Sequence, residues 1–194
     1  MISRTSSPTL RALGPLFTCA ALVLSVASCA GGSGGGAADA SSAGHSLIGK
    51  AAPELTTEAV SGDGPKTLKS AQGKVVILDF WGTFCEPCKK SFPKYQEIVD
   101  QFPGDVAVIA VSVDEPDNVK KEQLTAFAKE NHAKFSIVWD KDHSGAEKYG
   151  MRSLTMPSSF IIDKAGVVRH LHVGFKDGEE AKIAEEVKAL VAAK

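Results

Sequence analysis

The 194-residue sequence lacks an excess of positive charge. Its 22 lysines and arginines are outnumbered by 23 aspartates and glutamates, so the formal net charge is −1. Residues 1–28 contain two arginines and no acidic residue, and without them the net charge falls from −1 to −3. Proteins that bind nucleic acid through its phosphates carry clustered lysines and arginines. The composition therefore argues against nucleic acid, and we expect no such partner.

The sequence also lacks the second half of a zinc site. It has four cysteines, of which Cys85 and Cys88 form a C-x-x-C pair, with no second pair of this kind and no H-x-x-x-H motif. A structural zinc ion needs four protein ligands. His170 and His172 alternate along one segment, which is more typical of the surface of an edge strand than of a metal site. We therefore expect no metal ion and no other cofactor.

No apolar run at the N-terminus reaches the ~20 residues of a membrane-spanning helix. Residues 13–27 are mostly apolar, but glycine, proline, threonine and serine interrupt them. Arg4 and Arg11 precede this run, and a charged segment followed by a short apolar one is typical of a secretory signal peptide. The sequence thus predicts export from the cytoplasm.

The apolar run ends in Val26-Ala27-Ser28-Cys29, which resembles the bacterial lipobox. The resemblance implies cleavage before Cys29 and attachment of lipid to it. An ordinary signal peptide with a spare cysteine is the alternative, disfavoured because an exposed free thiol is a hazard in an oxidising compartment. We expect residues 1–28 to be a lipoprotein signal peptide, residues 29–46 a lipidated flexible linker, and residues 47–194 the folded domain. The acyl chains would hold the protein on a bacterial membrane, facing the periplasm or the cell exterior.

The apolar pattern of residues 47–194 alternates between strand and helix. Two runs, 74–81 and 106–113, have the composition of strands covered on both faces. Residues 47–70 are expected to form extended pieces at 52–55 and 66–68 around a turn. Further strands are expected at 136–139, 158–162 and 167–173, and helices at 86–102, 119–131, 144–149 and 178–192. This order predicts an α/β fold with a mixed central sheet flanked by helices.

The C-x-x-C pair lies where a buried strand gives way to a helix. The N-terminus of a helix offers unpaired N–H groups and the positive end of its dipole, and both favour a thiolate. Cys85 would therefore attack a substrate disulfide, and Cys88, one turn along, would resolve the mixed disulfide. A zinc half-site and a purely structural disulfide are the alternatives. A four-residue loop constrains the unfolded chain too little to favour the second.

The run Leu78-Asp79-Phe80-Trp81-Gly82-Thr83-Phe84-Cys85-Glu86-Pro87-Cys88-Lys89-Lys90 resembles the active-site segment of thioredoxin-like lipoproteins of the TlpA/ResA kind. Met156-Pro157-Ser158 is similar to the cis-proline loop of that family. The resemblance covers about residues 48–194. It implies a thioredoxin-like fold with a helix and a strand, at 119–131 and 136–139, inserted between the C-x-x-C helix and the cis-proline loop.

The same resemblance implies roles for four residues around the cysteines. Pro157 would be cis and lie against the disulfide, and Met156 would offer main-chain groups to an incoming peptide strand. Trp81 and Phe84 would form an apolar rim around Cys85. Plain core packing is the alternative for both aromatic residues, and an ordinary trans proline is the alternative for Pro157.

One departure from the family pattern concerns the proton chemistry. The family often has a glutamate three residues after the second cysteine, where this chain has Ser91. Asp79 lies six residues before Cys85, where thioredoxin itself has a buried carboxylate. We therefore hypothesise that Asp79 is the proton relay for Cys88, with a pKa raised by burial. The alternative is that Asp79 faces a solvent channel and has no role.

The resemblance implies an extracytoplasmic thiol–disulfide oxidoreductase. We expect a reductase that takes electrons from a transmembrane thiol reductant and reduces disulfides in exported proteins, with cytochrome c maturation as one setting. A disulfide oxidase or isomerase would use the same residues. A peroxiredoxin-like peroxidase would have threonine where Gly82 stands. A copper-binding protein of this fold would have three residues between its cysteines.

Overall fold

The computed structural model describes residues 44–153 and 155–193. The expected signal peptide at 1–28, the lipid-bearing Cys29 and nearly all of the linker at 29–46 lie outside the described residues and remain predictions. Within the described residues, no helix combines the length and the apolar character needed to cross a membrane.

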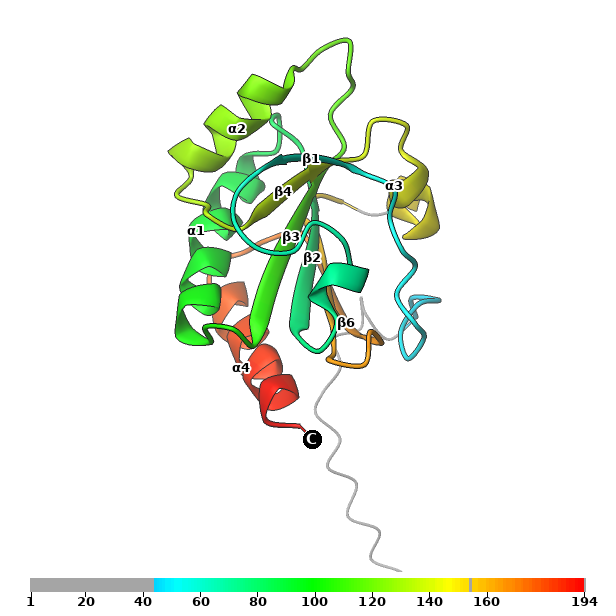
Figure 1. Cartoon of the computed structure of the whole chain (residues 1–194), viewed down its shortest axis with the longest axis vertical. Helices are drawn as coiled ribbons and strands as arrows, with labels where there is room; N and C mark the ends of the chain where they lie inside the picture. Colours follow the sequence, from blue (N-terminus) through cyan, green and yellow to red (C-terminus); the bar gives the residue numbers. More distant parts are fainter. Residues whose placement is uncertain (1–43, 154, 194) are drawn as a thin grey trace, which may run out of the picture. The chain divides into compact units, whose positions relative to one another are not determined.

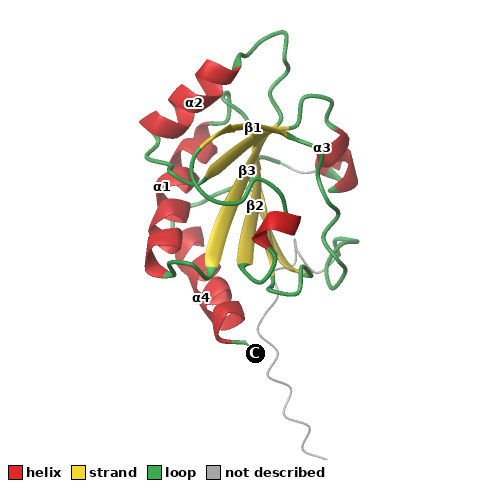
Figure 2. Cartoon of the chain, in the orientation of Figure 1, coloured by secondary structure: helices red, strands yellow, loops and turns green. Residues whose placement is uncertain are grey.

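The centre of the fold, within the described residues, is a six-stranded mixed sheet in the order β1-β4-β3-β2-β5-β6 (Figures 1 and 2). β2 (Val75–Trp81) and β3 (Val106–Ser112) are parallel neighbours, and all seven residues of each are buried. β4 (Ser136–Trp139) is parallel to β3, whereas β5 (Ser158–Ile162) and β6 (Val168–Val173) complete the sheet in antiparallel fashion. The predicted mixed sheet is confirmed.

Helices cover the two faces of the sheet unequally. α1 (Glu86–Gln101), α2 (Lys121–Glu130) and α4 (Glu179–Ala192) share one hydrophobic cluster with Val75, Ile77 and Trp81 of β2. The alternate residues of β2 belong to a second cluster on the other face, covered by α3 (Ser144–Lys148), the short 3-10 helix η1 (Lys69–Ala71) and the leading segment. Since side chains alternate along a strand, Asp79 lies on the face that α1 covers.

The predicted insertion is confirmed. α2 and β4 follow β3 and precede the cis-proline loop, and β4 pairs with β3. α1 starts one residue after Cys85 and continues through Pro93, so the helix tolerates a proline in its interior.

The prediction for residues 47–70 was wrong in detail. The strand of this segment is β1 (Glu58–Ser61), which pairs antiparallel with β4, and residues 66–68 lead instead into η1. β1 is a short edge strand of mixed polarity, so only its backbone pairing defines it and no apolar pattern marks it. The turn after it requires Gly62, whose φ is +79° and where a Cβ atom would lie 1.7 Å from the Phe135 carbonyl oxygen.

Candidate active site

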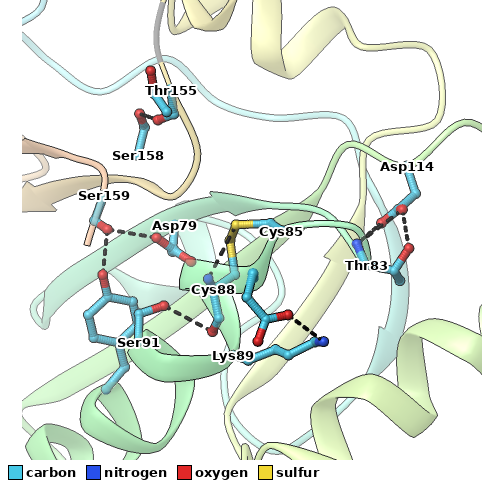
Figure 3. Close-up of a disulfide and its surroundings, with 12 residues drawn as sticks. Asp79, Thr83, Cys85, Cys88, Lys89, Ser91, Asp114, Thr155, Ser158 and Ser159 are labelled. Atoms are coloured by element: carbon cyan, nitrogen blue, oxygen red, sulfur yellow. Dashed lines mark hydrogen bonds and ion pairs between the residues drawn. A yellow bond between two sulfur atoms is a disulfide. The ribbon is translucent and has the colours of Figure 1, made fainter. Parts of the chain in front are cut away.

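The two cysteines lie at the junction of β2 and α1 (Figure 3). They form a disulfide with a Cα–Cα distance of 5.3 Å. Cys85 is the N-cap of α1, and its Sγ accepts a hydrogen bond of 3.2 Å from the Cys88 N–H. Cys88 is completely buried, whereas Cys85 keeps 6% of its surface exposed. Cys85 is therefore the cysteine that a partner can reach, and the helix N-terminus favours its thiolate when the disulfide is reduced.

The Met156–Pro157 peptide bond is cis, as predicted. Met156 packs against the hydrophobic cluster that contains Cys85 and Cys88. The segment after Pro157 is β5, which pairs with β2, the strand that leads into the C-x-x-C motif. The sheet thereby brings together two motifs that are about 70 residues apart in the sequence.

Asp79 is completely buried, and Figure 3 shows it beside the disulfide. Its Oδ1 accepts a 2.6 Å hydrogen bond from the Ser159 hydroxyl, and its Oδ2 has no hydrogen-bond partner within residues 44–153 and 155–193. Figure 3 shows the carboxylate between the Ser159 hydroxyl and the Cys88 end of the disulfide. Burial raises the pKa of Asp79 to about 7, and the Ser159 hydrogen bond offsets only part of that effect. The carboxyl group can therefore take up and release a proton near neutral pH.

Sequence reasoning missed the two residues that complete this environment. Ser159 lies opposite Asp79 in the β2–β5 register, and the Tyr95 hydroxyl lies 2.7 Å from the Ser159 Oγ. A serine has one hydroxyl proton, so when Ser159 donates to Asp79 it accepts from Tyr95. Burial raises the pKa of Tyr95 well above its usual value, which keeps its proton in place. Strand 158–162 was predicted, but no signal in the sequence gave the register that places Ser159 opposite Asp79.

The two aromatic residues expected at the rim have different positions. Trp81 is completely buried, and its ring packs at 4.6 Å from the Phe127 ring and 5.0 Å from the Phe92 ring. The rim prediction was therefore wrong for Trp81, because both faces of β2 are covered and its indole faces the helices. Phe84 is 70% exposed and is the only large exposed apolar side chain among the described residues.

A groove of about 320 Å³ lies beside Phe84. Met156 of the cis-proline loop lines it, together with Met151 and residues of α3. Two residues that the sequence marked for substrate binding, Phe84 and Met156, thus share one surface depression. Its lining residues are Phe84, Val113, His143, Ala146, Glu147, Met151, Arg152 and Met156.

Acidic side chains of α4 lie against both histidines of β6. His172, expected at the surface, is 3% exposed because α4 packs over it, and its two ring nitrogens lie 2.6 Å from Glu179 and 2.7 Å from Glu186. His170 lies 3.4 Å from Glu186. Among the described residues, no group of three or more histidine, cysteine or acidic side chains could hold a metal ion.

Replacing His172 by glutamine should destabilise the protein more in acid than in alkali. Burial lowers the pKa of His172, but the Glu186 and Glu179 carboxylates outweigh burial and leave the pKa raised. This contribution to stability is complete below the unfolded-state pKa of about 6.5 and is lost as the pH rises through the folded-state pKa. We expect a loss of about 3 kcal/mol at about pH 5.5, as for a broken buried ion pair, and a smaller loss at about pH 9.

Urea unfolding of both proteins at the two pH values measures this difference. His170→Gln is the matched control, since that side chain is one third exposed, and it should change stability little at either pH. An equal loss at both pH values for His172→Gln would contradict the charged network.

Comparisons with known proteins agree with the geometry. Residues 48–171 match the family model of the AhpC/TSA family. A thioredoxin-like protein YneN of Bacillus subtilis is 33% identical over 126 residues, which are 65% of this chain and 71% of the relative. A thiol-disulfide oxidoreductase ResA of Bacillus anthracis is 35% identical over 134 residues, covering 69% of this chain and 73% of the relative.

A solved structure has the same architecture. A crystal structure assigned to a thiol:disulfide interchange protein DsbE of Chlorobium tepidum superposes with a TM-score of 0.64. It is 30% identical in sequence, and the match covers 75% of this chain and 98% of that structure. The chain belongs to the AhpC/TSA family and is, within it, a ResA-like thioredoxin-family enzyme of the thiol–disulfide oxidoreductase class.

Proposed function

We propose that the protein is a membrane-anchored extracytoplasmic reductase, in which Cys85 is the nucleophile, Cys88 the resolving thiol and Asp79 the proton relay. The observation that carries the proposal is the placement of the cysteine pair: an accessible Cys85 at a helix N-terminus, and a completely buried Cys88, with the buried Asp79 carboxyl group close to the disulfide in Figure 3. The two cysteines have different environments, as two successive steps require.

In the first step, the Cys85 thiolate attacks one sulfur of a substrate disulfide. A mixed disulfide forms, and the other substrate sulfur leaves as a thiolate. In the second step, the Asp79 carboxylate takes the proton of the Cys88 thiol. The Cys88 thiolate then attacks the Cys85 sulfur, the Cys85–Cys88 disulfide forms, and the second substrate sulfur leaves. Two electrons have passed to the substrate, and the proton on Asp79 is available to the departing thiolate.

The partners follow from this chemistry. The oxidised pair must be reduced again, and a transmembrane thiol reductant would supply the two electrons. The substrates are disulfide-bearing exported proteins, and the ResA resemblance favours cytochrome c maturation among the possible settings. Phe84, Met156 and Pro157 would contact the substrate peptide. The lipid on Cys29 would hold the enzyme on the membrane at the end of the 29–46 linker.

The reduction potential of the Cys85–Cys88 pair tests the direction of electron flow. Equilibration of the purified protein with glutathione buffers, followed by alkylation of free thiols, gives this value. A potential near −270 mV, as in thioredoxin, supports a reductase, whereas about −120 to −180 mV indicates an oxidase or isomerase. If no reversible disulfide forms, the redox function is wrong. Hydrogen peroxide consumption, measured alongside, should stay at the background rate, and rapid turnover would instead favour the peroxidase alternative.

A further inference from the structure

A buried carboxylate outside the C-x-x-C motif holds the loop that carries the nucleophile. Asp114 follows β3 and is 2% exposed. Its oxygens accept hydrogen bonds from the Thr83 N–H, at 3.0 and 3.1 Å, from the Thr83 hydroxyl, at 2.6 Å, and from the Ser112 hydroxyl, at 2.9 Å. Thr83 is two residues before Cys85, so these bonds tie the active-site loop to the end of β3 (Figure 3).

Asp114 is itself held on two sides. The indole N–H of Trp139, the last residue of the inserted strand β4, donates a 2.8 Å hydrogen bond to the Asp114 carbonyl oxygen. The neighbouring Val113 N–H donates to the carbonyl oxygen of Trp81, at 2.9 Å. These two bonds hold the backbone at Asp114 in place, and the inserted helix–strand unit contributes one of them through Trp139.

The Asp114–Thr83 contact matters differently in the two redox states. In the disulfide form, Cys85 is covalently bonded to Cys88, which lies in the core on α1. The loop is then held both by the disulfide and by the hydrogen bonds between Thr83 and Asp114. In the dithiol form the disulfide bond is absent, so the position of the loop depends more strongly on the hydrogen bonds between Thr83 and Asp114. Loss of the contact should therefore raise the free energy of the dithiol form more than that of the disulfide form.

We propose that Asp114 is a positioning residue for Cys85, which acts through Thr83 to keep the active-site loop in place when the disulfide is open. This inference rests on the proposed thiol–disulfide function. It assigns to Asp114 control over the equilibrium in which the disulfide and two glutathione molecules give the dithiol and glutathione disulfide.

Thr83→Val and Asp114→Asn separate the contact from the charge. Thr83→Val removes the shortest of the hydrogen bonds but keeps the carboxylate, whereas Asp114→Asn removes the negative charge and replaces one of the two acceptor oxygens by an NH2 donor. The full-length protein is equilibrated with glutathione, free thiols are alkylated, and the tryptic peptide of residues 75–89, which contains both cysteines, is quantified by mass spectrometry. We expect both variants to shift the equilibrium toward the disulfide, by roughly threefold to tenfold, where tenfold corresponds to about 30 mV. Thr83→Ser, which restores the hydroxyl, should return it to the wild-type value.

Thermal unfolding of the oxidised and the dithiothreitol-reduced protein gives a second measurement. Both variants should lower the melting temperature of the reduced form more than that of the oxidised form. Asp163→Asn is the matched control, because Asp163 also accepts backbone hydrogen bonds, from Ala165 and Val167, but in the β5–β6 turn. It should lower both melting temperatures equally.

Two outcomes would overturn the proposal. Equal losses in both redox states with an unchanged equilibrium would make Asp114 a stabilising residue only. A shift toward the dithiol in Asp114→Asn, with none in Thr83→Val, would show that its charge acts and the contact does not. The wild-type protein in the same glutathione titration tests the redox function separately, and the melting comparison still tests the contact if that function fails.

Discussion

Cys88→Ser should attack a substrate disulfide once and then remain joined to the substrate through Cys85. Attack needs only the Cys85 thiolate at the N-terminus of α1, which this variant keeps. Resolution needs a second thiol within reach, and among the described residues no other cysteine is present. Turnover of insulin or of a disulfide peptide should therefore fall to background, while a covalent adduct accumulates in equal amount to the enzyme.

Non-reducing electrophoresis and mass spectrometry of the 75–89 tryptic peptide detect this adduct. Cys85→Ser is the paired control and should form no adduct with the same substrate, because Cys88 is completely buried. An adduct on Cys88 in that control would reverse the assigned roles. If neither variant forms an adduct, neither cysteine takes part in the reaction.

The parts of the fold that could be predicted have local signals. β2 and β3 are continuous apolar runs because both of their faces are covered, and β4 and β5 matched their predicted ranges. The C-x-x-C motif could be placed because strand and helix signals surround it, and Met156–Pro157 because that segment resembles the cis-proline loop of the TlpA/ResA kind. β1 could not be placed, since a short edge strand of mixed polarity is defined only by its partner β4.

The contacts around the site could not be predicted because they join residues distant in the sequence. Asp79 and Ser159 are 80 positions apart, and Thr83 and Asp114 are 31 apart. Each contact depends on which strands pair and on the register of the pairing. A single segment of the sequence shows neither of these properties. The same limit applies to Trp81, since a strand buried on both faces does not show which face meets the helices. His172 became buried because α4 packs over β6.

The raised pKa of Asp79 links its proposed role as a proton relay to the stability of the protein. A carboxyl group with a pKa of about 7 in the folded protein and 3.8 in its reference state binds its proton more tightly when folded. Stability therefore falls as the pH rises between these two values, because the unfolded chain binds fewer protons. This cost is present above neutral pH, where the relay needs the ionised form, so the function we assign to Asp79 opposes stability.

Asp79→Asn should thus make the enzyme slower and, at alkaline pH, more stable. The stability of the wild-type protein relative to the variant should fall by roughly 3 kcal/mol between about pH 5 and about pH 9, at about 1.4 kcal/mol per pH unit up to the folded-state pKa. Resolution of the mixed disulfide should slow about a hundredfold at neutral pH, the usual contribution of a positioned general base. Urea unfolding and stopped-flow measurement of the resolution step give the two quantities.

Ser159→Ala distinguishes a proton-relay role of Asp79 from a role in packing alone. The Ser159 hydrogen bond lowers the pKa of Asp79, so its removal should move the midpoint of the rate–pH profile to higher pH while the carboxyl group remains. Asp79→Asn should abolish that midpoint altogether. If Asp79→Asn leaves the rate–pH profile of resolution unchanged, Asp79 is not the relay, whatever its effect on stability. If the midpoint moves in Ser159→Ala and disappears in Asp79→Asn, the same buried carboxyl group determines both the rate of resolution and the loss of stability in alkali.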